Sequence, residues 1–228
     1  MLALGPGSSG KTNALVTMIT DRRFYRDKFA KIHWVSPTAT VDPGLDALRK
    51  YMETHSQNQD EDPTFHDGLT DETLDFLEER VEKARKVMTF MKDSKLPQQG
   101  FNTLIILDDL ADVRARPRLQ RFVDGCFVKF RHWGISTILA TQKLRLPLIS
   151  STVRVNLTAI LVWRLRNWQD LWDSFIYEYA ALVPKDKLLA AYKAATDQPY
   201  GFLSINLLAQ DKDRMFLNGF NAFFRMSD

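Results

Sequence analysis

Residues 5–12 carry the strongest chemical signal in the sequence, because they match the phosphate-binding loop G-x-x-x-x-G-K-T. The glycines let the backbone wrap tightly, so that successive N–H groups turn toward the phosphates of a nucleotide. Lysine adds a charge for the phosphate oxygens, and the threonine hydroxyl adds a ligand for Mg²⁺. The sequence therefore predicts binding of ATP and Mg²⁺ by Gly5, Pro6, Gly7, Ser8, Ser9, Gly10, Lys11, Thr12 and Asn13.

The flanks of this loop fit the strand–loop–helix context that the motif requires. Leu2-Ala3-Leu4 is an apolar run that predicts a buried strand, and apolar spacing after the loop predicts a helix whose dipole favours phosphate. A chance Gly/Ser turn is the alternative. The chain begins only four residues before the loop, so the first strand should be very short. A longer natural protein, a shortened chain or a misplaced start codon would each account for this.

Asp108 and Asp109 end a second signature, in which two carboxylates follow the apolar run Leu104–Leu107. Such a run predicts a strand that is buried on both faces. In phosphate-loop NTPases a carboxylate at the tip of this strand holds Mg²⁺, and a second acidic residue polarises the attacking water. We therefore predict Thr12 and Asp108 as metal ligands and Asp109 as catalytic. The alternative is a pair of aspartates in a solvated turn.

Gln142 follows another predicted strand, residues 135–141. An amide at the tip of a strand beside the Asp108 strand can contact both the γ-phosphate and the attacking water, a placement typical of motors built on the RecA-like core. The N-K-x-D motif with which GTPases read guanine is absent from the sequence. Small-molecule kinases usually lack the double carboxylate.

Strands and helices alternate along the chain, which predicts a RecA-like α/β core with a mostly parallel twisted sheet flanked by helices. We expect one domain, with a motor core at 1–165 and a C-terminal extension of helices and closing strands at 166–228. Strands are predicted at 2–4, 32–38, 103–109, 135–141, 159–163, 202–207 and 215–220. Helices are predicted at 42–52, 70–92, 117–130 and 168–182, and around Leu188, Leu189 and Tyr192.

Several side chains are assigned to core or solvent rather than to chemistry. The stretch 55–71 is polar, so it should be a surface loop in which His55 and His66 are solvated rather than metal-binding. Cys126 falls on the apolar face of its helix and should be an inert core residue. Helical apolar stripes should be buried in two further helices: Leu74, Leu77, Val81, Ala84, Val87 and Met88 in one, and Trp168, Leu171, Trp172, Phe175, Ile176 and Tyr179 in the other.

The overall composition limits the class of protein. Of 228 residues, 45% are hydrophobic and 26% charged, as in ordinary soluble globular proteins. No apolar run approaches the roughly 20 residues of a membrane span, and a single cysteine fits a reducing compartment. We therefore expect an intracellular protein without a membrane partner. The net charge of +3 is too small to indicate nucleic-acid binding by itself.

The ordered set of motifs resembles a known family. It comprises GPGSSGKT, WVSPTATVDP, LIILDDL and RHWGISTILATQ with Leu-Pro following. This set is similar to the genome-packaging ATPases of large DNA viruses, the poxvirus-type branch of the FtsK/HerA translocases, which have relatives in Polinton transposons. Tyr177-Glu178-Tyr179, Ala191–Thr196 and Phe202-Leu203 are similar to the C-terminal part of that family. The resemblance thus covers most of the chain, although the short first strand departs from it and leaves open whether an N-terminal element is missing.

This resemblance implies a homo-oligomeric ring that hydrolyses ATP and pumps double-stranded DNA, whatever its sequence, into a capsid. The implied partners are DNA and a capsid or portal protein, and the implied location is host cytoplasm, a viral factory or the virion. Candidate DNA contacts are the arginines between Arg114 and Arg121 and the turn Lys143-Leu144-Arg145, although such charge runs often form only a solvated face. The implied catalytic residues are Lys11, Asp109, Gln142 and, as the arginine finger, Arg131.

Arg131 precedes the strand that ends at Gln142, so it should lie near the sheet edge opposite the nucleotide. If it is catalytic, it must act on the nucleotide of a neighbouring subunit. The alternative is a helix cap or a surface ion pair, and Arg154 is the reserve candidate.

Two other functions stay open on sequence grounds: a phosphate-loop kinase of a small molecule, and an NTP-dependent assembly switch that does not translocate DNA. DNA-stimulated hydrolysis would favour the motor, and a phosphorylated acceptor would favour the kinase.

Overall fold

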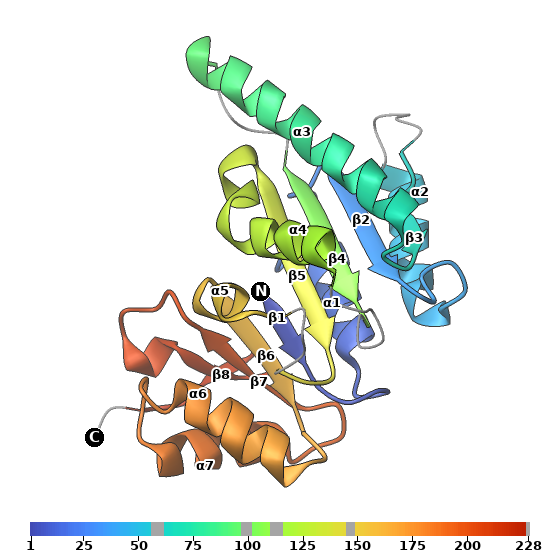
Figure 1. Cartoon of the computed structure of the whole chain (residues 1–228). Coiled ribbons are helices and arrows are strands. Elements are labelled where there is room, and N and C mark those ends of the chain that lie inside the picture. Colours follow the sequence, from blue (N-terminus) through green and yellow to red (C-terminus); the bar gives the residue numbers. More distant parts are fainter. Residues whose placement is uncertain (56–61, 97–101, 110–115, 145–148, 227–228) are drawn as a thin grey trace. The chain divides into compact units, whose positions relative to one another are not determined.

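The computed structural model describes residues 1–55, 62–96, 102–109, 116–144 and 149–226. The chain forms two compact units (Figure 1). The central unit is Thr12–Ile138, and the terminal unit combines Met1–Lys11 with Leu139–Asp228. The division of the chain into a motor core at 1–165 and an extension at 166–228 stays a prediction.

The central unit is built on parallel strands. β2 pairs in parallel with both β3 and β4, and β4 is followed in the strand order by the start of β5. β2 and β4 are apolar and buried along almost their whole length, which is typical of strands covered on both faces. In spatial order, the strands are β3 (Phe65–Asp67), β2 (Lys31–Ser36), β4 (Thr103–Asp108) and β5 (Ile135–Thr141).

Helices cover this sheet, with α3 and α4 on one face and α1 on the other (Figure 1). As predicted, α3 begins after Thr70, whose hydroxyl accepts a hydrogen bond from the Thr73 amide at 3.1 Å. The helical elements are α1 (Lys11–Thr20), η1 (Pro43–Leu45), α2 (Asp46–His55), α3 (Asp71–Asp93), α4 (Pro117–Val128) and η2 (Phe130–Trp133).

The apolar stripe predicted for α3 is buried only in its first half. Leu74, Leu77 and Val81 are buried, whereas Val87 is exposed and Ala84 and Met88 are half-buried. The reason is visible in Figure 1, where the second half of α3 extends beyond the strands on which the first half packs.

The terminal unit combines parallel and antiparallel strands. β1 lies between the end of β5 and β6 and pairs with both in parallel, whereas β6, β7, β8 and β9 pair in antiparallel. The parallel α/β core and the closing strands are therefore both confirmed. These strands are β1 (Leu2–Leu4), β6 (Ala159–Trp163), β7 (Phe202–Asn206), β8 (Phe216–Asn218) and β9 (Ala222–Phe223).

The helices of the terminal unit differ from prediction in one place. The segment predicted as one α-helix at 168–182 contains the π-helix η3, followed by the short α6. Trp168, assigned to the core from its spacing, is 66% exposed and stacks on Trp172 with a ring separation of 5.4 Å. The helical elements are α5 (Ser151–Val155), η3 (Asp170–Ile176), α6 (Tyr177–Tyr179), α7 (Lys185–Ala195), which packs on β7 and β8, and η4 (Lys212–Arg214).

The prediction that 55–71 is a solvated loop is wrong at its C-terminal end. Residues 65–67 form β3, and His66 is buried against His33, with 3.3 Å between His33 Nδ1 and His66 Nε2. The side chain of His55 lies outside the described residues. Cys126 is buried as predicted, and burial raises the pKa of its thiol to about 12, so the thiol stays protonated.

Among the described residues, each helix is too short or too polar to cross a membrane.

Candidate nucleotide site

The phosphate loop of the terminal unit leaves β1 beside the end of β5. Leu4 is in register with Thr141, and the Gly5 amide donates a hydrogen bond to the Thr141 carbonyl at 3.0 Å. The backbone then passes through the left-handed region at Ser8, with φ of 59°, and at Gly10, with φ of 92°. These two positions let the loop reverse tightly before α1 begins at Lys11.

Lys11 reaches back across this loop. Its ammonium group donates hydrogen bonds to the carbonyl oxygens of Gly5 at 2.8 Å and Pro6 at 2.9 Å. The two carbonyls fix the cation over the loop, where it can meet the phosphate oxygens of a nucleotide.

Gly5 is required by close packing. A Cβ at this position would lie 2.8 Å from the Cβ of Trp163 and 2.9 Å from the Oγ of Ser9. That Ser9 hydroxyl is buried and has no hydrogen-bond partner among the described residues. Because β6 supplies Trp163, the start of the loop is held between β5 and β6.

In the central unit, the turn around Gly44 comes close to Thr12 at the start of α1, which the phosphate-loop motif does not predict. A Cβ added to Gly44 would lie 3.4 Å from the Thr12 methyl group and 3.0 Å from Asp42 Oδ1, which accepts a hydrogen bond from the Gly44 amide at 2.8 Å. The turn after β2 thus approaches the predicted metal ligand Thr12. Its only sequence signal is the turn-forming triplet Asp42-Pro43-Gly44.

The two carboxylates of the second signature occupy different environments. Asp108 is the last residue of β4 and is 8% exposed, whereas Asp109 is exposed and turns the chain with φ of 52°. Val35 pairs with Leu107, so Asp108 ends its strand beside the end of β2. A buried carboxylate at a strand end and the hydroxyl of Thr12 are hard oxygen donors, which suit Mg²⁺. Among the described residues, no group of three or more His, Cys, Asp or Glu side chains could hold a metal by itself.

Gln142 lies where the sequence predicted it, directly after β5 and exposed. Because the preceding residue, Thr141, accepts the hydrogen bond from Gly5, the backbone of Gln142 lies beside the start of the phosphate loop within the terminal unit.

Arg131 lies in η2 of the central unit and is exposed. The carbonyl of Gly134, which ends η2, accepts a hydrogen bond from the Thr103 amide at 2.9 Å. Arg131 is therefore near the amino end of β4, and Asp108 is at the carboxyl end. This confirms the predicted position but does not test the role. The reserve candidate, Arg154, contacts Glu178 Oε1 at 3.2 Å and the Ile149 carbonyl at 2.8 Å.

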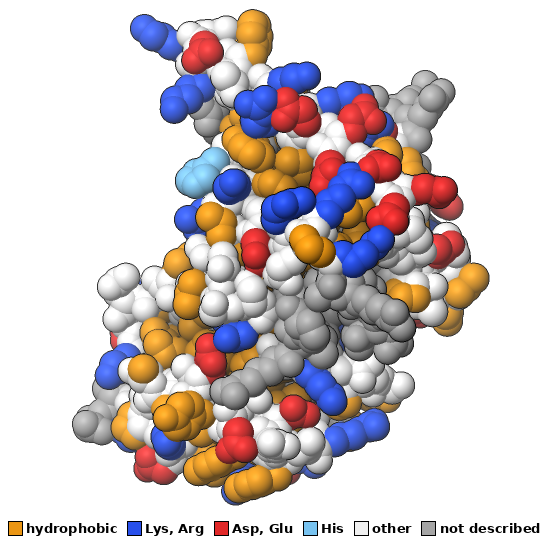
Figure 2. Space-filling view, viewed as in Figure 1, with side chains coloured by type: hydrophobic (Ala, Val, Ile, Leu, Met, Phe, Trp, Pro, Cys, Tyr) orange, Lys and Arg blue, Asp and Glu red, His pale blue; other side chains and the backbone are white. Residues whose placement is uncertain are grey.

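Two of the predicted DNA-contacting arginines already have acidic partners on α3. Arg116 pairs with Asp71 at 2.8 Å, and Arg118 pairs with both Asp75 and Glu78. In Figure 2, blue and red side chains alternate over α3 and α4 rather than forming a basic band. Arg121 and Lys143 are exposed, whereas Arg114 and Arg145 lie outside the described residues.

No protein-family model and no curated protein matches the chain in sequence. Solved structures do match its fold. The pCW3 conjugation coupling protein TcpA with ATPγS is similar with a TM-score of 0.57 and 13% identity, over 92% of this chain and 57% of TcpA. The genome packaging NTPase B204 of Sulfolobus turreted icosahedral virus 2, in complex with sulfate, has a TM-score of 0.54 and 16% identity, over 92% of both chains.

The cytoplasmic domain of the type VII secretion ATPase EccC of Thermomonospora curvata has a TM-score of 0.57 and 12% identity, over 96% of this chain and 27% of EccC. The chain thus spans just over half of TcpA and about a quarter of EccC. At these identities the similarity concerns the fold, and the chain has the mixed α/β fold of the P-loop NTPases, as predicted. A viral packaging NTPase is among its structural neighbours, in agreement with the resemblance drawn from the motifs.

Proposed function

We propose that this chain is a Mg²⁺-dependent ATPase that moves double-stranded DNA, as a homo-oligomeric ring that fills a viral capsid in the infected cell. The observation that carries the proposal is the loop at Gly5–Lys11, with its lysine fixed over the loop carbonyls and its start bonded to the end of β5. The similarity to B204, a genome packaging NTPase, and to TcpA, a conjugation coupling protein, supports a DNA motor over a kinase.

The predicted residues have separate roles in hydrolysis. Lys11 would neutralise phosphate charge, and Thr12 and Asp108 would hold Mg²⁺, which would supply further positive charge for the transferring phosphoryl group. Asp109 and Gln142 orient and polarise the attacking water. Double-stranded DNA would be held by its phosphates, without sequence preference, and a capsid or portal protein would receive the ring.

The decisive experiment measures phosphate release from ATP with and without double-stranded DNA of mixed sequence, together with the mass in solution. We expect hydrolysis that requires Mg²⁺, rises with DNA and is lost in Lys11→Ala. The matched control is Lys193→Ala, which removes an exposed lysine on α7. Hydrolysis indifferent to DNA would favour the assembly switch, and transfer of phosphate to a small acceptor would establish the kinase instead.

A further inference from the structure

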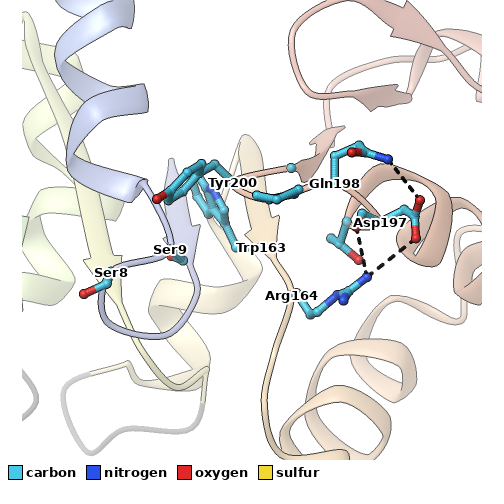
Figure 3. A pocket seen from close by; sticks show the side chains of 10 residues that line it. Ser8, Ser9, Trp163, Arg164, Asp197, Gln198 and Tyr200 are labelled. Carbon is cyan, nitrogen blue, oxygen red and sulfur yellow. Dashed lines mark hydrogen bonds and ion pairs between the residues drawn. The ribbon is translucent and has the colours of Figure 1, made fainter.

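A pocket of about 370 Å³ opens beside the phosphate loop, entirely within the terminal unit. The loop contributes Ser8 and Ser9, the end of β6 contributes Trp163 and Arg164, and the segment 196–201 after α7 forms the rest. In Figure 3 the side chain of Tyr200 reaches from this segment toward the loop, above Trp163. The volume falls in the lower range of small-molecule sites, which span roughly 300–1,000 Å³.

Tyr200 occupies a backbone position that does not suit it. Its φ is 63°, in the left-handed region that glycine adopts at little cost, and the Gly201 amide closes the turn with a hydrogen bond to the Gln198 carbonyl at 3.0 Å. A bulky residue at positive φ is strained, and strain of this kind concentrates at functional sites. Burial of the side chain does not offset this backbone strain, because Tyr200 is 71% exposed.

The turn has close contacts at both ends. Gly201 cannot take a side chain, since a Cβ would lie 2.5 Å from the Ala195 carbonyl oxygen. At the other end, the Arg164 guanidinium donates to the Asp197 carbonyl at 3.4 Å and lies 3.9 Å from the Asp197 carboxylate (Figure 3). The structure thus holds an exposed aromatic ring in a defined place at the rim of the pocket.

The Tyr200 side chain lies against the phosphate loop. Atoms of the Tyr200 side chain lie 3.2 to 3.6 Å from where a Cβ on Gly10 would be, so the ring rests on the residue just before Lys11. Two polar atoms of pocket-lining residues, Ser9 Oγ and Trp163 Nε1, are buried without a hydrogen-bond partner in the described part of the chain. These atoms are covered by protein, so the open feature of the pocket is the exposed aromatic ring at its rim, which suits a flat heteroaromatic ring.

The geometry points to this pocket as the nucleobase subsite, with Tyr200 stacking on the base of the nucleotide whose phosphates the loop binds. This inference rests on the proposed ATP binding and adds a residue that the sequence motifs do not contain. Stacking is tolerant of base identity because every base has a π-face, so Tyr200 should hold adenine and guanine nucleotides alike.

The test compares equilibrium binding of ATP with binding of inorganic tripolyphosphate, which has the phosphates but no base. The ring is removed by Tyr200→Gly, since glycine relieves the left-handed backbone and keeps the turn. We expect ATP affinity to fall about tenfold or more, the range of one base–aromatic stack, while tripolyphosphate affinity is unchanged. Tyr200→Phe should bind ATP as the wild type does, and so should Tyr177→Ala, which removes another exposed tyrosine of this unit.

Other outcomes separate this inference from the function on which it rests. Unchanged ATP binding by Tyr200→Gly would overturn the base subsite and leave the ATPase proposal intact. An equal loss for ATP and tripolyphosphate would mean that Tyr200 only supports the loop, which also overturns the subsite. If the wild type bound neither compound, both proposals would fail.

Discussion

The backbone N–H of Gly5 donates to the carbonyl of Thr141 at 3.0 Å, which joins the first residue of the phosphate loop to the last residue of β5. The parallel register of Leu4 with Thr141 continues the same pairing one step earlier. Gln142 is the next residue, so its side chain leaves the backbone beside the start of the loop. One strand pair therefore places the phosphate loop and the predicted sensor Gln142 side by side.

The first prediction follows from this placement. Gln142→Ala should lower the rate of ATP hydrolysis about 10- to 100-fold, because the amide stabilises the attacking water and the transferring phosphoryl group but little of the ground state. The dissociation constant for ATP should change less than about threefold. Single-turnover hydrolysis and equilibrium binding measure the two effects separately. Gln169→Ala, an exposed glutamine of the same unit, is the control, and a normal rate in Gln142→Ala would remove the sensor role.

The second prediction concerns the two carboxylates after β4. Asp109→Asn should still bind ATP, but its rate of ATP hydrolysis should be lower by at least about 100-fold, because an amide of the same size cannot polarise the attacking water. The control is Asp93→Asn at the exposed end of α3. If Asp109→Asn hydrolyses ATP as fast as the wild type, the acidic pair must have another role.

The parts of the site that were predictable from sequence are local patterns. The loop 5–12 has fixed spacing. Asp108 follows a continuous apolar run, and Gln142 follows a run rich in β-branched and apolar residues, so the predicted strands agree with the observed ones. The mixed fold followed from their alternation with helices.

The parts that were missed depend on partners distant in sequence. His66 looks polar in a polar stretch, yet β3 pairs with β2 and places it against His33 and Phe76. Tyr200 carried a weak local signal, the turn triplet Pro199-Tyr200-Gly201, but only the folded chain shows that its ring rests on Gly10.

The third prediction is a pH dependence of stability that arises at His33. His33 is 1% exposed, and burial, with His66 beside it, lowers its pKa to about 4; burial also lowers the pKa of His66. Asp62 is close by and carries ion pairs to Lys31 and Arg80. An unfolded histidine, with a pKa near 6.5, takes up a proton first as the pH falls. The free energy of unfolding should therefore fall between about pH 6.5 and 4, by on the order of 2–3 kcal/mol.

Urea unfolding at pH 7, 6 and 5 measures how the free energy of unfolding depends on pH. His33→Phe should make this pH dependence weaker, since Phe packs beside Phe76 and has no proton to gain. The control His132→Gln, on the exposed surface, should leave the pH dependence unchanged. A stability that rises as the pH falls would contradict the assignment, because it would mean that the folded protein holds the protonated form.

The last prediction concerns Arg131. β4 runs from Thr103, bonded to the turn after η2, to Asp108, and five steps of about 3.3 Å separate these ends by about 16 Å. That is much more than an arginine side chain spans, so Arg131 cannot assist hydrolysis at the Asp108 of its own chain. In the described residues its exposed guanidinium has no ion-pair partner, which leaves it free to enter a neighbouring subunit. There it would neutralise charge on the transferring phosphoryl group.

Mixing two inactive variants tests this action in trans. Arg131→Ala subunits keep the phosphate loop and Lys11→Ala subunits keep the arginine, so hydrolysis should be near zero in each alone and recover in the mixture. In a mixed ring, Arg131 of a Lys11→Ala subunit serves the intact loop of its neighbour. Arg22→Ala, which removes an exposed arginine after α1, should stay active by itself because it removes charge without removing the finger. Near-normal hydrolysis by Arg131→Ala alone would exclude the residue from catalysis. Two inactive variants that stay inactive together would contradict action in trans.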